Sequence, residues 1–259
     1  MKVVTWNVNS LKARLPRVLE LLAEHAPDVG LLQETKCEPA AFAVDELAAA
    51  GYHAVHQSAG RWAGVAIVAR RELELADPVA GLPGELQTGE ARWIEATVGG
   101  LRVASVYVPN GRAPGTPTFA EKLTFLDALA ARVAALREDE QQMIVGGDFN
   151  VAPADIDVYD PEAFVGATHV TAGERERVEA ILAAGQLVDS FRRLHPDAVQ
   201  HTWWDYRQGH FHRGLGLRID LVLISEALGT RLVSCAIARE YRKGSKPSDH
   251  APLVVELAR

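Results

Sequence analysis

The N-terminal stretch that decides the fold reads Val3-Val4-Thr5-Trp6-Asn7-Val8, a segment with Leu15, Val18 and Leu22, and then Val29-Gly30-Leu31-Leu32-Gln33-Glu34. The first and last runs are short and largely apolar and contain β-branched residues, which is typical of buried strands. The apolar residues between them recur at helical spacing, and Pro16 suits the first turn of a helix. The chain therefore begins with a predicted strand–helix–strand unit.

Further along the chain, strand patterns outnumber helix patterns. Two longer helices are predicted from capping boxes, Thr118 with Glu121 and Thr171 with Glu174, and the second is expected to end at Gly185. Seven further segments have the apolar or alternating pattern of strands: Gly64–Arg70, Ala91–Thr97, Leu101–Val108, Gln141–Val145, Arg218–Ser225, Arg231–Ala238 and Ala251–Leu257. Because these strands follow one another in hairpin-like succession, the sequence favours an α/β fold with two mixed sheets packed face to face and helices outside them.

Composition fits one domain across residues 1–259, because 48% of the residues are hydrophobic and no linker-like tract interrupts the chain. The 27 Lys and Arg against 34 Asp and Glu give a net charge of −7, so any nucleic-acid affinity must come from a local basic patch. Cys37 and Cys235 are too few for a disulfide framework or a cysteine zinc site, which indicates a reducing compartment. No apolar run approaches the ~18 residues that span a bilayer, and we expect a cytoplasmic protein with no membrane partner.

Polar side chains appear where the predicted strands begin or end. Taken alone, Asn7, Tyr107, Asp148 and Asp249 are more simply turn, cap or core residues. Glu34 is less easily explained in that way, because an unpaired carboxylate at a buried strand end is costly. Asp148 and Asn150 follow a short apolar run through a predicted Gly146-Gly147 turn. Strand starts and strand ends reach one rim if the strands concerned run antiparallel, so the whole set can gather there: Asn7, Glu34, Tyr107, Asp148, Asn150, Asp220, Asp249 and His250.

Four carboxylates in one place require compensation. Two unit charges ~4 Å apart repel by about 4 kcal/mol at an effective dielectric constant of ~20. Protonation, cationic side chains or a metal ion must offset this repulsion. The candidate ligands are oxygens with one imidazole and no thiolate, which favours Mg²⁺ or Mn²⁺ over zinc. Phosphate chemistry is the natural use of such a site, because the ion can neutralise a phosphate oxygen and the leaving alkoxide.

A second region, from Arg192 to Arg218, has the composition of a nucleic-acid-binding surface. It holds five arginines against two aspartates, together with four histidines and the aromatic residues Trp203, Trp204, Tyr206 and Phe211. Arginines can bind phosphates while aromatic faces replace an unstacked base. We expect Arg207 and Phe211 to contact DNA, whereas Trp204 is equally well explained as a core residue. The segment Arg231–Lys246 either extends this surface or forms a solvated charged hairpin, and Lys36 and Lys122 are interpreted as surface lysines.

Five motifs in order resemble the exonuclease III family of abasic-site endonucleases, of the bacterial exodeoxyribonuclease III type. They are Glu34-Thr35, Tyr107-Val108-Pro109-Asn110, Gly147-Asp148-Phe149-Asn150-Val151-Ala152-Pro153, Leu217-Arg218-Ile219-Asp220 and Ser248-Asp249-His250-Ala251-Pro252. Their order and spacing match from Met1 to Arg259. The resemblance implies a four-layer α/β sandwich with the DNase I-like fold of the endonuclease/exonuclease/phosphatase superfamily.

The resemblance also implies roles for these residues. A divalent metal is expected at Glu34 with support from Asn7, and Asp249 serves the metal region. Asp148, helped by Asn150, orients or deprotonates the attacking water, and His250 contacts the scissile phosphate while Asp220 holds it. Tyr107 and Asn110 are expected to contact phosphate. The segment from Trp203 to Leu217 is expected to line the pocket for a baseless sugar, with Leu217 aliphatic where some family members have an aromatic residue.

The activity implied is that of a Mg²⁺-dependent DNA repair nuclease. It would hydrolyse the phosphodiester 5′ to abasic sites in duplex DNA, with 3′→5′ exonuclease and 3′-phosphatase or 3′-end-cleaning activity. Its expected partner is double-stranded DNA with abasic sites or 3′ ends, bound by a monomer at the bacterial nucleoid. Two alternatives stay open: a phosphoesterase of the same superfamily acting on a small phosphoester such as an inositol phosphate, and a non-catalytic DNA-binding module.

Overall fold

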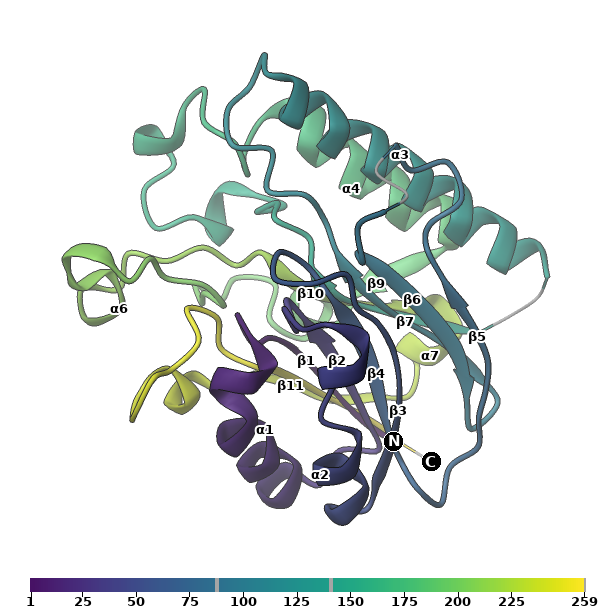
Figure 1. The fold of residues 1–259 in the computed structure, drawn as a ribbon. Helices are drawn as coiled ribbons and strands as arrows, with labels where there is room; N and C mark the ends of the chain where they lie inside the picture. The colour runs from purple at the N-terminus through teal and green to yellow at the C-terminus, as the bar shows by residue number, and fades with distance from the viewer. Residues whose placement is uncertain (87–88, 140–141, 259) are drawn as a thin grey trace.

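Two six-stranded mixed sheets form the centre of the computed structural model, which describes residues 1–86, 89–139 and 142–258 (Figure 1). The first sheet has the order β11 (Leu232–Ile237), β12 (Leu253–Leu257), β1 (Lys2–Asn7), β2 (Val29–Gln33), β4 (Val65–Arg70) and β3 (Tyr52–Gln57). The second has the order β5 (Leu75–Ala80), β6 (Trp93–Val98), β7 (Leu101–Tyr107), β8 (Met143–Asp148), β10 (Asp220–Ser225) and β9 (Leu187–Asp189).

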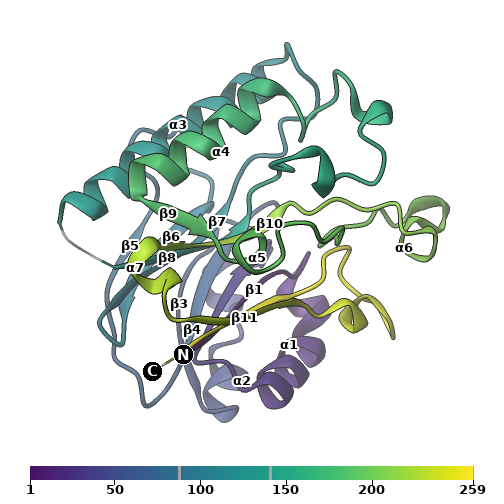
Figure 2. The same cartoon turned by 180° about the vertical axis from the view of Figure 1, so that it is seen from behind.

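Helices cover the outer faces of both sheets. The longer ones are α1 (Leu11–His25) with α2 (Val44–Ala49) on the first sheet, and α3 (Pro117–Glu138) with α4 (Ala172–Gly185) on the second (Figure 2). Three short helices lie in connections: α5 (Ser190–Leu194), α6 (His210–Arg213) and α7 (Glu226–Gly229). The predicted four-layer α/β sandwich with two face-to-face mixed sheets is therefore confirmed. No helix of the described residues is long and apolar enough to cross a membrane.

Three apolar layers hold the sandwich together. Val3, Leu31 and Ile67 of the first sheet pack against Ile144 and Val222 of the second. The other two layers lie under the helices, with Trp6, Leu22 and Leu32 on one side and Val106, Leu129 and Val145 on the other. Alternate residues of the central strands thus face opposite apolar layers, which fixes the register of each strand because a slip by one residue would exchange the two faces.

The paired glycines Gly146 and Gly147 lie inside β8, and the prediction of a turn there was wrong. A Cβ atom on Gly147 would lie 1.9 Å from the carbonyl oxygen of Val106, and one on Gly146 would lie 2.6 Å from Leu31 Cδ1. Only glycine lets β8 come this close to β7 and to the facing sheet. The strand therefore continues to Asp148 and delivers that carboxylate at its last residue.

The helix starts differ from two of the predictions. Helix α1 begins at Leu11, so Pro16 lies inside the helix and not in its first turn. Helix α3 begins at Pro117 with Thr116 as its cap, because Thr116 accepts a hydrogen bond from Phe119 N and proline fits the first helical position. The predicted Thr118–Glu121 capping box was therefore wrong. The Thr171–Glu174 box and the end of α4 at Gly185 are confirmed.

Three strands, β3, β5 and β9, were not predicted from the sequence. Strand β5 has only partly buried and exposed residues, and β9 has three residues, so neither presents a clear apolar period. Gln141, the expected start of another strand, lies outside the described residues, and that strand is described from Met143.

Candidate active site

The polar rim forms where central strands of both sheets end. Asn7 is the last residue of β1, and Glu34 directly follows β2. In the second sheet Asp148 of β8 is in register with Tyr107 on one side and Asp220 on the other. Strand β10 runs antiparallel to β8, so its first residue reaches the rim where β8 ends. The first sheet thus supplies Asn7 and Glu34, and the second supplies the other three.

Asn7 joins the two sheets at this rim. Its Nδ2 donates to Glu34 Oε1 at 2.7 Å and to Asp148 Oδ2 at 2.9 Å. Its Oδ1 accepts from the backbone N–H of Asn9 at 3.0 Å, and this donor fixes which way the amide faces. Asn7 therefore bridges the carboxylates of Glu34 and Asp148 with its amide nitrogen. Its amide oxygen faces Asn9 and not the space between these two carboxylates. Glu34 itself has a φ of 53°, a left-handed backbone conformation of the kind that clusters at functional sites.

His250 and Asp220 form a buried pair behind Asp148. His250 Nδ1 lies 2.8 Å from Asp220 Oδ2, and His250 Nε2 lies 3.7 Å from Asp148 Oδ2. The backbone around the imidazole is also fixed, because Trp6 Nε1 donates to the carbonyl oxygen of His250 and Ser248 Oγ accepts from its N–H. A carboxylate on one ring nitrogen sets the orientation of the other, so Nε2 is directed toward the rim.

Burial and neighbouring charges shift two pKa values at the rim in ways that match this geometry. Burial, with the charges of Asp220 and Glu34 adding to it, raises the pKa of Asp148 to about 7, against the opposing effect of His250. Burial alone would lower the pKa of His250, but the charges of Asp220 and Asp148 outweigh it and raise the pKa to about 10. The two groups titrate together, and as the pH falls the imidazole of His250 takes up a proton before the carboxylate of Asp148 does.

Asp249 belongs to a neighbouring network. Its two carboxylate oxygens accept from Asn9 Nδ2 at 3.0 Å and from Trp203 Nε1 at 3.1 Å. Lys36 closes the network, because its Nζ lies 2.6 Å from Asn9 Oδ1 and 2.5 Å from Glu34 Oε2. Asp249 is thus linked to Glu34 through Asn9 and Lys36 and is not part of the tightest acidic group.

Asn150 and Asn110 lie beside Asp148 on the loop side of the rim. The N–H of Asn150 donates to Asp148 Oδ1 at 2.9 Å, and its Nδ2 donates to the carbonyl oxygen of Val108 at 3.0 Å. Asn110, which is exposed, donates to Asn150 Oδ1 at 3.3 Å. The fixed amide of Asn150 and the exposed amide of Asn110 can therefore hold groups that approach Asp148.

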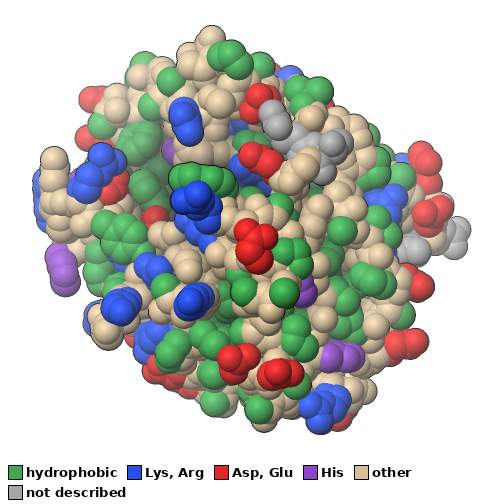
Figure 3. Space-filling view, in the orientation of Figure 1, with side chains coloured by type: hydrophobic (Ala, Val, Ile, Leu, Met, Phe, Trp, Pro, Cys, Tyr) green, Lys and Arg blue, Asp and Glu red, His purple; other side chains and the backbone are tan. Residues whose placement is uncertain are grey.

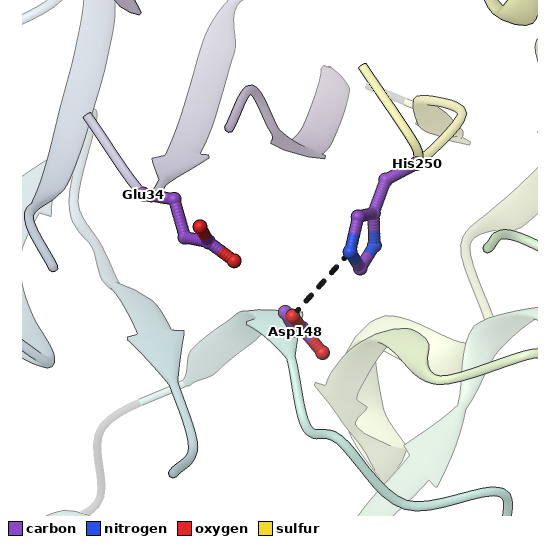
Figure 4. Close-up of side chains that lie close together, drawn as sticks. All are labelled: Glu34, Asp148 and His250. Carbon is purple, nitrogen blue, oxygen red and sulfur yellow. Dashed lines mark ion pairs between the residues drawn. The ribbon is translucent and has the colours of Figure 1, made fainter. Parts of the chain in front are cut away.

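The acidic group fits a divalent cation. Glu34, Asp148 and His250 each present one ligand atom to a common space, and these atoms lie within 4.8 Å of one another (Figure 4). The carboxylates of Glu34 and Asp148 are the oxygen donors that Mg²⁺ or Mn²⁺ accepts, whereas His250, with its pKa raised to about 10, presents a protonated imidazole to the same space. Lys36 already offsets part of the negative charge at Glu34, so the cluster does not depend on protonation alone.

Besides Asn110, the four DNA contacts predicted in the segment from Trp203 to Leu217 occupy different environments. Arg207 has an 84% exposed side chain and pairs with Asp205, and Trp203 is partly buried beside Asp249. Leu217 is fully buried and pairs through its backbone with Trp203. Phe211 is only 8% exposed, which contradicts its prediction as a surface contact. It packs edge-on against Trp204 and lies under the guanidinium groups of two arginines that the sequence places 28 and 31 positions later, Arg239 and Arg242.

Several residues of the site were missed or misread in the sequence. Asn9 and Lys36 stand two positions after Asn7 and Glu34, and this shared spacing was the available signal. Lys122 was taken for a surface lysine but is fully buried, with its ammonium group on Glu174 and on the carbonyl oxygen of Asn150. Its place on the apolar face of α3, between Phe119 and Leu126, could have indicated burial.

Comparison with known proteins gives the class and the family of this chain. The fold is the DNase I-like fold, and the model of the Endonuclease/Exonuclease/phosphatase family matches residues 4–250. Exodeoxyribonuclease III of Haemophilus influenzae is 31% identical over 269 residues, covering 99% of this chain and 100% of that protein.

Two solved structures are closely similar. The 3′ phosphatase NExo from Neisseria, bound to a product DNA hairpin, is 40% identical with a TM-score of 0.96 over 100% of both chains. An AP endonuclease from Archaeoglobus fulgidus is 34% identical with a TM-score of 0.94 over 99% of both chains. The chain belongs to the endonuclease/exonuclease/phosphatase family, and within it to the exodeoxyribonuclease III and AP endonuclease type of enzyme.

Proposed function

We propose that this enzyme hydrolyses the phosphodiester 5′ to abasic sites in duplex DNA and also removes nucleotides or phosphates from 3′ ends, with Mg²⁺ or Mn²⁺ as cofactor. The observation that carries the proposal is the group of Glu34, Asp148 and His250 with their ligand atoms within 4.8 Å. The two solved relatives support the activities, since one is a 3′ phosphatase with product DNA and the other an AP endonuclease.

Each rim residue has a role in this reaction. A cation held at Glu34 would polarise the phosphate and stabilise the leaving oxygen. Asp148, with its raised pKa of about 7, orients or deprotonates the attacking water, and Asn150 fixes one oxygen of that carboxylate. His250 donates from Nε2 to a phosphate oxygen while Asp220 holds Nδ1. Tyr107 and Asn110 hold the phosphate at the side where the DNA strand enters.

The surface beside the rim favours DNA over a small phosphoester. Lys and Arg side chains gather on the face beside α6 (Figure 3). Arg207 is exposed there, and the exposed Lys243 and Lys246 extend the basic surface. A polyanion gains from several such contacts along its backbone, whereas an inositol phosphate would reach few of them. Trp203, which is partly buried, then lies where the pocket for a baseless sugar is expected, whereas Leu217 lies fully buried behind it.

Product analysis on labelled duplexes tests the proposal. One duplex carries a tetrahydrofuran site, one a 3′ phosphate and one a recessed normal 3′ end. We expect Mg²⁺-dependent incision 5′ to the tetrahydrofuran and release of the 3′ phosphate. If none of the duplexes is cleaved while an inositol phosphate is hydrolysed, the small-phosphoester alternative replaces this one.

Glu34→Ala tests the metal assignment. Cleavage should fall at least ~100-fold, because a bound cation supplies several kcal/mol of charge stabilisation in the transition state. DNA binding in EDTA should stay unchanged or tighten, since a negative charge near a polyanion is removed. Glu38→Ala, an exposed glutamate four positions later, is the matched control and should leave both quantities unchanged. Cleavage by Glu34→Ala at the parental rate would refute the assignment.

We also propose that the enzyme works as a monomer in the bacterial cytoplasm, at the nucleoid, through its affinity for DNA. Sedimentation with and without a duplex checks the first statement. A dimer that persists at low concentration would contradict it.

A further inference from the structure

A second recess adjoins the rim at Tyr107. It has a volume of about 290 Å³, and its lining includes Tyr107, Asn110 and Trp62. Tyr107 joins the recess to the rim, because it is in register with Asp148 and its ring is covered by Arg92 at 4.6 Å. Whatever fills the recess therefore lies directly beside the group that reacts at Asp148.

Trp62 stands on the β3–β4 connection and is 75% exposed, more than any other tryptophan of the chain. The exposed indole therefore has a face on which a planar ring can stack. The connection is also fixed to the rim. Thr35 and Lys36 donate backbone hydrogen bonds to the carbonyl oxygens of Gly64 and Ala63 at 3.1 and 2.9 Å. A Cβ atom on Gly64 would lie 2.1 Å from Thr35 Oγ1, so the loop packs tightly on the segment after Glu34.

The charges around the recess disfavour a phosphate as its occupant. Glu90 and Glu121 line it together with Arg92 and Arg112, so the formal charges balance. Arg92 is in addition occupied by Glu90 and by the Tyr107 ring. A neutral, planar group with hydrogen-bonding edges suits this lining, and the volume fits one such group and not a larger ligand.

We propose that this recess takes the base of a nucleotide next to the reacting phosphate, with the base stacked on the indole of Trp62. Every base has a face that can stack, so the contact is tolerant of sequence and suits a single-stranded or unpaired nucleotide. The inference rests on the proposed function, because it places a DNA strand along the rim. It adds that the enzyme binds an unpaired nucleotide beside the reacting phosphate more tightly than a nucleotide without a base.

A coupling experiment between protein and DNA tests the stacking. Oligonucleotides with a 3′ overhang carry one tetrahydrofuran unit, moved one position at a time along the strand, and binding is measured in EDTA. For the unmodified strand, Trp62→Ala should bind about 10-fold more weakly than the parent, while Trp62→Phe should retain most of the affinity. When the tetrahydrofuran unit stands at one particular position, the parent should bind the strand more weakly than the unmodified strand by a similar factor. Trp62→Ala should bind that strand and the unmodified strand equally well. Val165→Ala, at an 84% exposed residue, is the control for a change at the surface.

The fluorescence of Trp62 gives an independent measurement. Acrylamide should quench the parent more than Trp62→Phe, and the oligonucleotide should remove this difference by covering the indole. The stacking would be overturned if the parent lost the same affinity at every position of the tetrahydrofuran unit, or if Trp62→Ala bound the unmodified strand as tightly as the parent. Incision assays on the parent keep this outcome separate from the proposed function, because a parent that cleaves duplexes while no position couples to Trp62 refutes the stacking alone.

Discussion

The catalytic rim and the segment from Trp203 to Leu217 lie side by side but are built differently. On the rim, Asn7, Asp148 and Asp220 are at most 1% exposed, and each lies at a strand end whose register is fixed by its neighbours. The segment is a long connection with short helical turns, from which Tyr206 and Arg207 project into solvent. Sheet register thus fixes the groups to which we assign the chemistry, whereas a loop carries the groups to which we assign substrate selection.

The largest effect is expected from breaking the rim with Asp220→Asn. The replacement keeps the shape but removes the charge that holds the proton on His250, so the imidazole, buried and without that charge, should lose its raised pKa of about 10. Turnover should fall by about 10³- to 10⁴-fold, as when a neutral amide replaces the carboxylate of other histidine–aspartate pairs. DNA binding in EDTA should change less than about threefold. NMR titration of the ring nitrogens measures the pKa directly.

Glu174→Gln is the control for this variant, because it also neutralises a buried carboxylate that pairs with a cation, here Lys122. It should lower stability while the titration of His250 keeps its parental midpoint. An unchanged His250 midpoint in Asp220→Asn would show that Asp220 does not control the charge of the imidazole.

The rim could be predicted from the sequence because its signals are local. Asn7, Glu34 and Asp148 each directly end or follow an apolar run, and β-strand periodicity is visible over six residues. Strand order decides whether Asp220 and His250 lie beside them. The apolar pattern of the strands does not give this order, and the resemblance of the ordered motifs to a known family indicated it instead. The antiparallel pairing of β10 with β8 then brings Asp220 beside Asp148.

The burial of Phe211 and the ion-pair partner of Lys122 could not be predicted in the same way. Phe211 is covered by Arg239 and Arg242, and Lys122 is neutralised by Glu174, which lies 52 positions away. Sequence composition treats such arginines and lysines as exposed charges. The place of Lys122 on the apolar face of α3 indicates its burial, but nothing local indicates its partner Glu174. Only the packing of α3 on α4 and of the segment 239–242 on Trp204 decides these cases.

A pH-dependent loss of stability is expected from His169, which lies under the loop that carries Asn150. Burial, with the nearby charge of Lys122, lowers its pKa to about 4, below the ordinary value of 6.5. Between these values the unfolded chain binds a proton that the folded chain excludes, so stability falls as pH falls from 6.5 toward 4. The slope from one such group is at most about 1.4 kcal/mol per pH unit. Urea unfolding at a series of pH values measures it.

His169→Asn isolates this contribution, because asparagine tolerates the φ of 79° at this position better than most residues. The variant is expected to have a shallower fall of the urea midpoint between pH 6.5 and 4, while above pH 6.5 the two curves run parallel. Identical slopes in parent and variant would mean that other groups cause the acid sensitivity.

The smallest effect is expected in the segment from Trp203 to Leu217, where Arg207→Ala removes one exposed guanidinium. Binding to a duplex should weaken about three- to fivefold, and the dependence of log K on log salt should become shallower by about one unit, the change expected from one phosphate contact. Asp205→Asn should do the opposite, since the Asp205 carboxylate accepts hydrogen bonds from Arg207 Nε at 3.0 Å and from Nη2 at 2.5 Å and competes with DNA for this guanidinium. Arg71→Ala, at the other end of β4 from the rim, is the matched control and should leave the salt slope unchanged. If Asp205→Asn also weakened binding, the ion pair between Asp205 and Arg207 would serve to hold the loop in place. The segment from Trp203 to Leu217 would then be more rigid, and its difference from the rim smaller, than proposed.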